Sequence, residues 1–422
     1  MIFNSYKEKY IFYYFPTILF SLIPFFLITG PFLPDLSISL ITIIFLFYCF
    51  KKKNFSFFKN KYFYIFLIFW FYLIFNSLMN NFNLDSLKIS FFYFRYGVFV
   101  VAVTTYMQND EKIIKYFFYC IFICFIILIL DGYYQYFFQK NILGWGTHTR
   151  LSSFFGDEKI LGSYICRLWP IFFGLGILFF KKKDKLFILL ILIFILSESL
   201  IFLTGERVAF FYINLSAIFV IIFSQKLLNL RLITLISSLA LIVLISYLNP
   251  IAKQRMIDTT FKQMNLNNMD KNKNTETVYI FSKQHTHHYI TAYRIFLDNK
   301  IFGVGVKNFR NFCDREKYAV SYLSCAPHPH NTYLQILSEI GIIGFLFLLT
   351  AFFYFSKNVI IHLFLKIKNK YLFSDFEICI LSGLLIYLWP IAPTGNFFNN
   401  WLTILMILNL PFFIWSRGKK VK

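Results

Sequence analysis

Apolar stretches of about twenty residues recur along the whole chain, and they limit its possible folds more than any other feature. A helix that crosses a bilayer needs about 20 mostly apolar residues. We expect about twelve such helices, at residues 11–30, 34–50, 62–79, 89–107, 116–138, 161–180, 186–203, 208–224, 232–249, 331–355, 376–392 and 401–416. Of the 422 residues, 58% are hydrophobic, more than a soluble core of this size could hide. The sequence therefore predicts an all-α polytopic membrane protein.

The expected spans divide the chain into three regions. Residues 1–249 carry transmembrane helices 1–9, residues 250–330 form one large loop with short helices, and residues 331–422 carry helices 10–12. No small-residue cleavage site follows the N-terminal segment, so we expect an uncleaved first helix rather than a signal peptide.

Basic residues are distributed unequally between the two sets of connections. Clusters rich in Lys lie at 51–53, 181–185 and 366–370, whereas the turns 31–33 and 393–400 on the opposite side contain no Lys or Arg. The positive-inside rule places the basic connections and both termini in the cytoplasm. A net charge of +22 would suggest a nucleic-acid partner in a soluble protein. Here the Lys clusters of the cytoplasmic connections explain the positive charge. We therefore expect membrane lipids but no nucleic acid as partners.

The chemically distinctive residues gather on the opposite, outer side. Of the seven histidines, only His362 is expected inside. The outer connections also hold Arg150, Arg207 and Arg294. A transporter would be expected to place polar groups near the bilayer midplane, so this gathering favours chemistry at the outer surface.

The segment PHPHN at residues 327–331 precedes the tenth expected span. Its prolines disfavour helix before this point, and Asn331 or Thr332 is a suitable N-cap, so His330 should lie at a helix N-terminus. A lone histidine is usually a satisfied surface residue. Here, however, a polar stripe continues along one face of the helix, made of Asn331, Gln335, Ser338 and Glu339. The combination favours a functional role for His330, with His328 in support.

The expected tenth span also carries residues that should contact protein. An acidic residue such as Glu339 is costly inside a membrane and should face protein or water. Gly341 and Gly344 are expected to allow close contact with another helix. Both features indicate that this helix lies inside the bundle.

The large outer loop has two parts of different character. Residues 262–287 are rich in Asn and Lys and are expected to be flexible. Residues 288–312 are expected to be ordered, with a helix that stops near Asn299 and a tight turn at Gly303 and Gly305. Cys313 and Cys325 follow in the same loop. Since the outer compartment is oxidising, we predict a disulfide between them, which typically adds ~3 kcal/mol and would brace the approach to His330.

Four sequence blocks, in order, resemble the O-antigen ligase and polymerase superfamily of membrane glycosyltransferases. They are TRLSSFFGDEKILGSYI, LTGERVAFF, YRIFLDNKIFGVGVKNF and HNTYLQILSEIGIIG, and they cover about residues 145–350. The resemblance implies a GT-C-like fold and matches Arg207, Arg294 and His330, and less securely Arg150, to residues that the family needs. Three departures are Ser153, where the family often has Gly, Asp157-Glu158, where it often has Asn, and Glu206, whose carboxylate could weaken the binding of an anion by Arg207.

The resemblance implies transfer of a glycan from undecaprenyl diphosphate to an acceptor hydroxyl on the periplasmic face of a bacterial inner membrane. Such a reaction needs a general base for the hydroxyl proton and positive charge for the departing diphosphate. We predict His330 as the base, because a helix N-terminus disfavours imidazolium. Arg207 and Arg294 are the predicted diphosphate clamp, since guanidinium binds phosphate bidentately.

A metal-dependent site is the main alternative, although no cofactor is expected. The only adjacent acidic pair in the outer loops is Asp157-Glu158, so we predict metal independence. The rival is a zinc site composed of His285, His287, His288, His328 and His330. It is disfavoured because part of it falls in the segment expected to be flexible. Arg95 and Arg167 lie inside spans near the outer end, where they either line the lipid-diphosphate groove or reach to the surface.

Several functions share these motifs. The spacing of the His-Asn block favours a ligase of lipopolysaccharide biosynthesis that transfers a finished glycan to lipid A-core. An O-antigen polymerase that joins lipid-linked repeat units and a protein O-oligosaccharyltransferase are alternatives. A transporter or flippase is the alternative from a different class, disfavoured because no inverted internal repeat is visible. The sequence leaves the sugar, its linkage, the acceptor and the oligomeric state open.

Overall fold

The structure, a computed structural model, describes residues 5–80, 83–146, 150–180, 185–225, 228–264, 279 and 282–419. Within these residues the regular structure is helical and no strand occurs. Ten helices in the described part of the chain are long and apolar enough to cross a membrane. The predicted all-α polytopic architecture is therefore confirmed, and each expected span coincides with a helix.

The helices follow one another with short connections in the N-terminal half of the chain. The first span, Tyr6–Phe26, joins α1 (Tyr6–Lys9), a π-helical turn and α2 (Phe15–Phe26). The next helices are α3 (Phe32–Lys51), α4 (Lys61–Met79), α5 (Leu84–Phe92), α6 (Phe94–Asn109), α7 (Lys112–Phe138), α8 (Leu161–Phe179), α9 (Lys185–Thr204), α10 (Arg207–Phe223) and α11 (Leu228–Leu248). The chain continues with α12 (Pro250–Lys253), α13 (Thr259–Gln263), α14 (Lys283–Asp298), α15 (Thr332–Ile367), α16 (Asp375–Leu388), α17 (Asn400–Ile407) and α18 (Asn409–Lys419).

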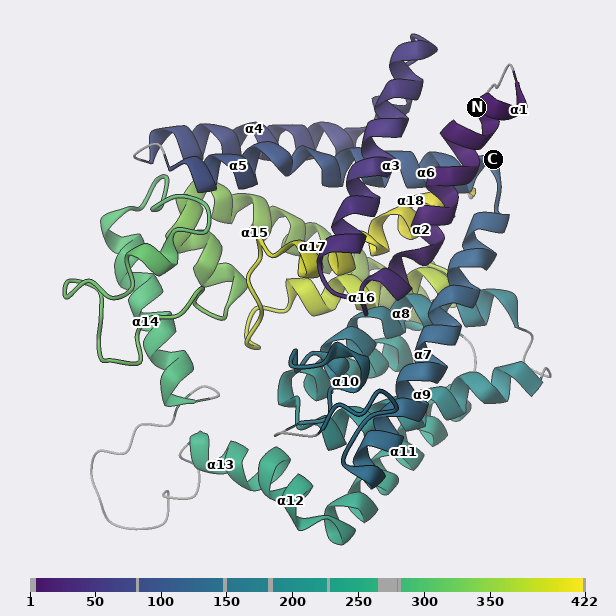
Figure 1. Cartoon of the computed structure of the whole chain (residues 1–422), viewed down its shortest axis with the longest axis vertical. Helices are drawn as coiled ribbons and strands as arrows, with labels where there is room; N and C mark the ends of the chain where they lie inside the picture. Colours follow the sequence, from purple (N-terminus) through teal and green to yellow (C-terminus); the bar gives the residue numbers. More distant parts are fainter. Residues whose placement is uncertain are drawn as a thin grey trace.

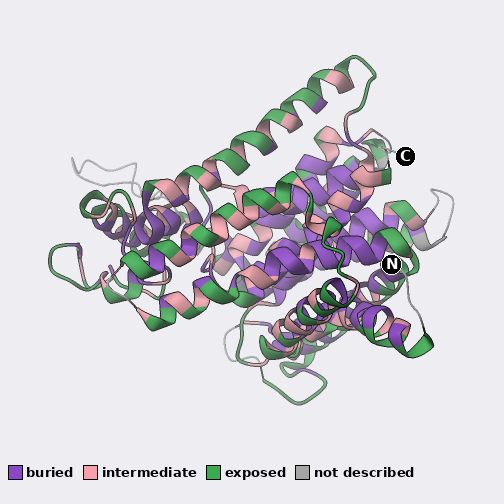
Figure 2. Ribbon diagram, turned by 90° about the horizontal axis from the view of Figure 1, so that it is seen from above, coloured by how far each residue is buried: buried purple, intermediate pink, exposed green. Residues whose placement is uncertain are grey.

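Two of the expected spans form short helices. Helix α10 has 17 residues and α16 has 14, fewer than the roughly 20 that a perpendicular span needs. Both pack against α8, whose residues are almost all buried between Leu161 and Gly176. Figure 2 shows this pattern, with buried residues concentrated in the inner helices and exposed residues on the outer faces of the peripheral ones.

Helix α15 is broken in its N-terminal third, and the outer loop docks on the break. Ile340 and Gly341 have non-helical backbone angles, with φ +67° at Gly341. The amide of Ile342 donates to the carbonyl of Lys300 at 2.9 Å. A Cβ on Gly341 would lie 2.1 Å from the carbonyl oxygen of Ile301. The expectation that Gly341 mediates contact between helices was therefore wrong, because this glycine instead permits the break that receives the loop.

The predicted Gly-x-Gly turn is the other half of this junction. Gly303 and Gly305 both have positive φ, and the amide of Gly305 donates to the carbonyl of Glu339 at 2.7 Å. A Cβ on Gly303 would lie 2.4 Å from the backbone of Glu339. Two of the four sequence blocks thus form one structural unit.

The ordered part of the outer loop begins earlier than the sequence indicated. Residues 265–278 and 280–281 of the segment expected to be flexible lie outside the described residues. Residues 283–287, however, belong to α14, whose N-terminus is capped by the side chain of Ser282. The helix ends at Asp298, as expected, and packs beside α15 (Figure 1). This packing brings the α14 histidines to the N-terminus of α15.

Candidate active site

The backbone around His330 is fixed from both sides. Helix α15 starts at Thr332, and the N-cap Asn331 accepts hydrogen bonds from the amides of Tyr333 and Leu334. His330 directly precedes the cap with φ +56°, and its carbonyl accepts a 2.8 Å hydrogen bond from the amide of Thr394. The structure thus places His330 at a helix N-terminus.

Four histidine rings meet at this point. The centroid of the His330 ring lies 4.1 Å from that of His328, 5.3 Å from that of His288 and 5.4 Å from that of His285. His287 is outside the cluster, because its ring hydrogen-bonds to Ser321. Within the described residues, no group of three or more His, Cys, Asp or Glu side chains is arranged to hold a metal ion.

Burial keeps these rings neutral. Desolvation is the largest cause for each ring, and it lowers the pKa of His330 below 6.5. Burial, and then repulsion from the charge that His330 carries when it is protonated, lower the pKa of His285 and His288 to about 4 and that of His328 to about 3. A neutral imidazole has one ring nitrogen able to accept a proton. Near pH 7 the cluster can therefore act as a base but carries no charge of its own.

A basic group lies beside the histidine cluster. Arg207, the first residue of α10, donates to the hydroxyl of Thr260 at 3.2 Å. Its charge contributes to the lowered pKa of His285. Burial first, and then the charges of Arg150 and Arg207, lower the pKa of Arg255. Arg150, Arg207 and Arg255 are therefore close enough to interact electrostatically, and we call them the arginine group. The sequence placed Arg255 on the outer face but gave it no role in the site, because its position in a short helix after α11 gives no motif.

The carboxylate of Glu206 is engaged elsewhere. It accepts hydrogen bonds from the amides of Gly162 at 2.6 Å and Ser163 at 3.0 Å, at the N-terminus of α8. Burial raises its pKa to about 7. The expectation that Glu206 weakens the binding of an anion by Arg207 was therefore wrong, because the carboxylate caps the N-terminus of α8 instead.

Ser153 shows why the family often has Gly at its position. Its φ is +49°, in the left-handed region that favours glycine. The side chain of Asp131 accepts its hydroxyl, and Gln135 accepts its amide at 2.8 Å. These buried contacts from α7 fix the loop that carries Arg150.

The other predicted arginines have distinct surroundings. Arg294 is exposed, and the hydrogen bond that the described residues give it runs to the carbonyl of Ala319 at 3.2 Å. Arg95 forms a 2.6 Å ion pair with Asp35 of α3. It is therefore neutralised there, and it is not among the residues that line the cavity beside His328. Arg167 is buried and does line a cavity.

The polar stripe of α15 is fully used inside the protein. Gln335 donates to Glu339 at 2.9 Å and accepts from the amide of Phe397. The carboxylate of Glu339, which is completely buried, accepts from the amides of Lys307 and Phe309. The stripe therefore ties two outer connections to the helix that presents His330.

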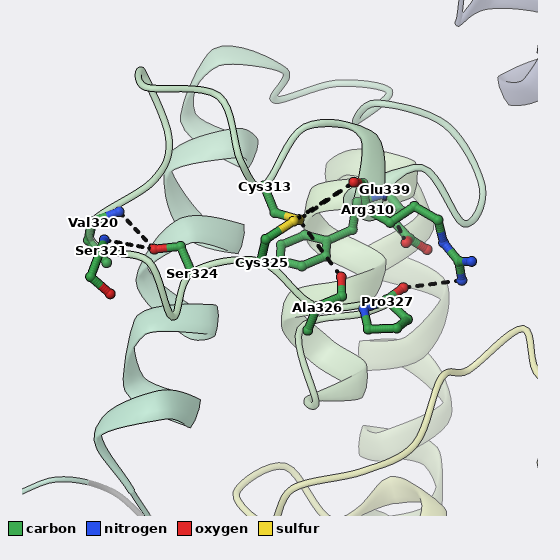
Figure 3. Close-up of a disulfide and its surroundings, with 10 residues drawn as sticks. Arg310, Cys313, Val320, Ser321, Ser324, Cys325, Ala326, Pro327 and Glu339 are labelled. Carbon is green, nitrogen blue, oxygen red and sulfur yellow. Dashed lines mark hydrogen bonds between the residues drawn. A yellow bond between two sulfur atoms is a disulfide. The ribbon is translucent and has the colours of Figure 1, made fainter.

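The outer loop is closed by a disulfide between Cys313 and Cys325, the pair that the sequence had singled out. Their Cα atoms lie 4.8 Å apart. Figure 3 shows the bond beside Pro327, whose carbonyl accepts from Arg310 at 3.3 Å. Since His328 and His330 follow directly, the disulfide restricts the backbone segment that leads into the histidine cluster.

The fold and this arrangement together define a polytopic membrane protein with a histidine-centred, arginine-flanked site between its bundle and a large loop. Residues 186–349 match the model of the O-antigen ligase family, a segment that contains Arg207, Arg294 and His330. The resemblance drawn from the motifs is therefore confirmed over this segment. It supports a membrane glycosyltransferase of the O-antigen ligase or polymerase type. No curated protein matches the chain.

Proposed function

We propose that the protein transfers a glycan from undecaprenyl diphosphate to an acceptor hydroxyl at the periplasmic face of the inner membrane. The observation that carries this proposal is the neutral histidine cluster at the N-terminus of α15 beside the arginine group. Glycosyl transfer from a diphosphate requires two components, a general base and a group of cations that binds the diphosphate.

In the proposed reaction, His330 takes the proton of the acceptor hydroxyl as the oxygen attacks the anomeric carbon. The bond between that carbon and the diphosphate oxygen breaks, and undecaprenyl diphosphate leaves with the electron pair. Arg207 and Arg150 bind the departing diphosphate through bidentate guanidinium contacts. Arg294 completes the clamp from α14, since its exposed guanidinium has donors left for phosphate oxygens.

A ligase that acts on lipid A-core is the first candidate, because the His-Asn block has the ligase spacing. A polymerase that joins lipid-linked repeats is the second, since the family match covers both types. Lipopolysaccharide from a deletion strain separates them. Bare core with stranded lipid-linked polymer indicates a ligase, whereas core carrying a single repeat indicates a polymerase. Unaltered lipopolysaccharide would reject both.

A further inference from the structure

A cavity of about 800 Å³ lies at the other end of α10 from the histidine cluster. Arg207 begins α10, whereas Val220 and Ser224 in the last turns of that helix line the cavity. At 1.5 Å per residue, the part of α10 between Arg207 and Val220 spans roughly 20 Å. The other walls come from the second half of α8, the first turns of α9, α11 and α16, and the end of α18. These helix ends adjoin the connections rich in Lys, so the positive-inside rule places the cavity on the cytoplasmic side.

A buried arginine lies in the wall of this cavity. Arg231, at the start of α11, lines the cavity and is 9% exposed. One terminal nitrogen of its guanidinium donates to the carbonyls of Val220 and Ile221. Its Nε and its second terminal nitrogen have no hydrogen-bond partner among the described residues. An arginine that extends to the membrane surface would be exposed, and buried donors left unpaired are costly, so this wall is suited to a bound acceptor.

A second unpaired donor lies in the opposite wall. Trp169 of α8 is 3% exposed and lines the same cavity. Its ring packs against those of Phe173 and Phe194, with both pairs of centroids 5.0 Å apart. The indole N–H, which can only donate, has no partner in the described part of the chain. Donors without partners therefore come from two different helices around one cavity.

The charges around Arg231 favour an anion. Asp375, the acidic residue among the cavity's lining side chains, and Lys366 of α15 both interact electrostatically with Arg231. The carboxylate of Asp375 accepts from the amide of Gln225 at 2.6 Å. Two further ion pairs close to these residues are each balanced, and they are Lys419–Glu111 and Arg417–Glu377. Among the described residues this group thus has two cations and one carboxylate, so a ligand with one negative charge would balance it.

The cavity reaches the molecular surface at residues typical of a membrane boundary. Its exposed lining residues are Leu178, Tyr371 and Lys419, and tyrosine is enriched where bilayer meets water. Most of the remaining wall is apolar and includes Phe173, Ile177, Phe187, Ile191, Phe194 and Val220. An apolar wall suits a hydrocarbon chain, and a guanidinium suits phosphate oxygens. Basic pockets between transmembrane helices on the cytoplasmic side are a recurrent site for anionic lipid headgroups.

We propose that this cavity binds an anionic phospholipid of the cytoplasmic leaflet. The lipid phosphate accepts from the free nitrogens of Arg231, and an acyl chain lies along the apolar wall. The bound lipid joins α8, α10 and α11 at the membrane boundary, and it thereby stabilises the bundle. This inference is independent of the proposed function, because His330 and the arginine group do not line the cavity.

Native mass spectrometry of the full-length protein tests the assignment with two probes of matched acyl chains, phosphatidylglycerol and the uncharged-overall phosphatidylethanolamine. The wild type should bind phosphatidylglycerol about tenfold more tightly, and Arg231→Gln should remove this preference, because a hydrogen bond from a charged group to phosphate is lost. Lys368→Gln removes an exposed cation on the same face outside the cavity and should keep the preference. Ala217→Phe fills the cavity without changing its charge and should lower retention of phosphatidylglycerol. Equal binding of both lipids by the wild type, or an unchanged preference in Arg231→Gln, would overturn the proposal.

Thermal unfolding of the wild type gives a second test that does not depend on how the variants fold. Phosphatidylglycerol should raise the melting temperature more than phosphatidylethanolamine does, because a ligand that binds only the folded protein stabilises it. Inorganic phosphate should leave the melting temperature unchanged. An equal rise with inorganic phosphate would identify an anion site without a lipid, and no rise with phosphatidylglycerol would reject the site. Neither measurement needs glycan transfer, so its outcome is separate from that of the proposed function.

Discussion

At the scale of single residues, the site depends on keeping His330 uncharged beside cations. Three further imidazoles lie against it, and among the described residues no negative charge raises its pKa. Burial then lowers its pKa. A general base near a cationic diphosphate site gains from this arrangement, because a protonated ring could not accept the hydroxyl proton.

The pH dependence follows from the direction of these shifts. The acid limb of kcat/KM should lie below pH 6.5, the ordinary value for imidazole, because the pKa of His330 is lowered. The free energy of unfolding should also decrease as the pH falls. As pH falls from about 6.5 towards about 4, the rings of the unfolded chain protonate before the folded His285 and His288 do, so their contribution lowers the free energy of unfolding. An acid limb above pH 6.5 would contradict the burial argument.

The clamp residues give a second prediction at this scale. Arg207→Gln and Arg294→Gln should each lower glycan transfer by tenfold or more, since a charged hydrogen bond to phosphate is worth about 1.5–3 kcal/mol. The assay is transfer from a lipid-linked donor by protein that inserts in normal amounts. Lys300→Gln, which removes an exposed cation of the same outer loop, serves as the control. Normal transfer by the Arg207 variant would remove this residue from the clamp.

At the scale of elements, the junction between the broken α15 and the Gly303–Gly305 turn positions the site. Gly341→Ala should destabilise the protein by about 1–3 kcal/mol or more, because the residue needs positive φ and has no room for a Cβ. Thermal unfolding in detergent measures the effect. Gly418→Ala is the control, since a Cβ there would meet only the Gln108 side chain at 3.4 Å. Equal melting temperatures for the two variants would refute this role of Gly341.

The disulfide between Cys313 and Cys325 is a second feature that positions the site. Cys313→Ser with Cys325→Ser should cost about 2–4 kcal/mol of stability and lower transfer, because the chain that carries His328 and His330 loses its brace. The matched control is Cys120→Ser, a free cysteine in α7. Unchanged activity of the double variant at a temperature where it stays folded would show that the brace does not position the site.

At the scale of the whole molecule, the sequence predicted the positions of the apolar helices, because apolar length is a local signal, although ten rather than twelve helices in the described residues are long and apolar enough to span a membrane. It also predicted the N-cap at Asn331 and the end of α14, where turn chemistry decides the boundary. The sequence grouped His285 and His288 with His330 only in the disfavoured zinc alternative, because their meeting depends on how α14 packs on α15.

Transfer by a His330→Gln protein in reconstituted membranes, with disulfide formation and thermal stability checked beside the wild type, tests directly whether His330 is the general base. Glutamine keeps the size and polarity of the side chain but cannot act as a base. We expect a loss of transfer of about 10²–10⁴-fold, the usual contribution of a general base, while binding of the lipid-linked donor is retained. Transfer at the wild-type rate by this variant would show that His330 is not the base.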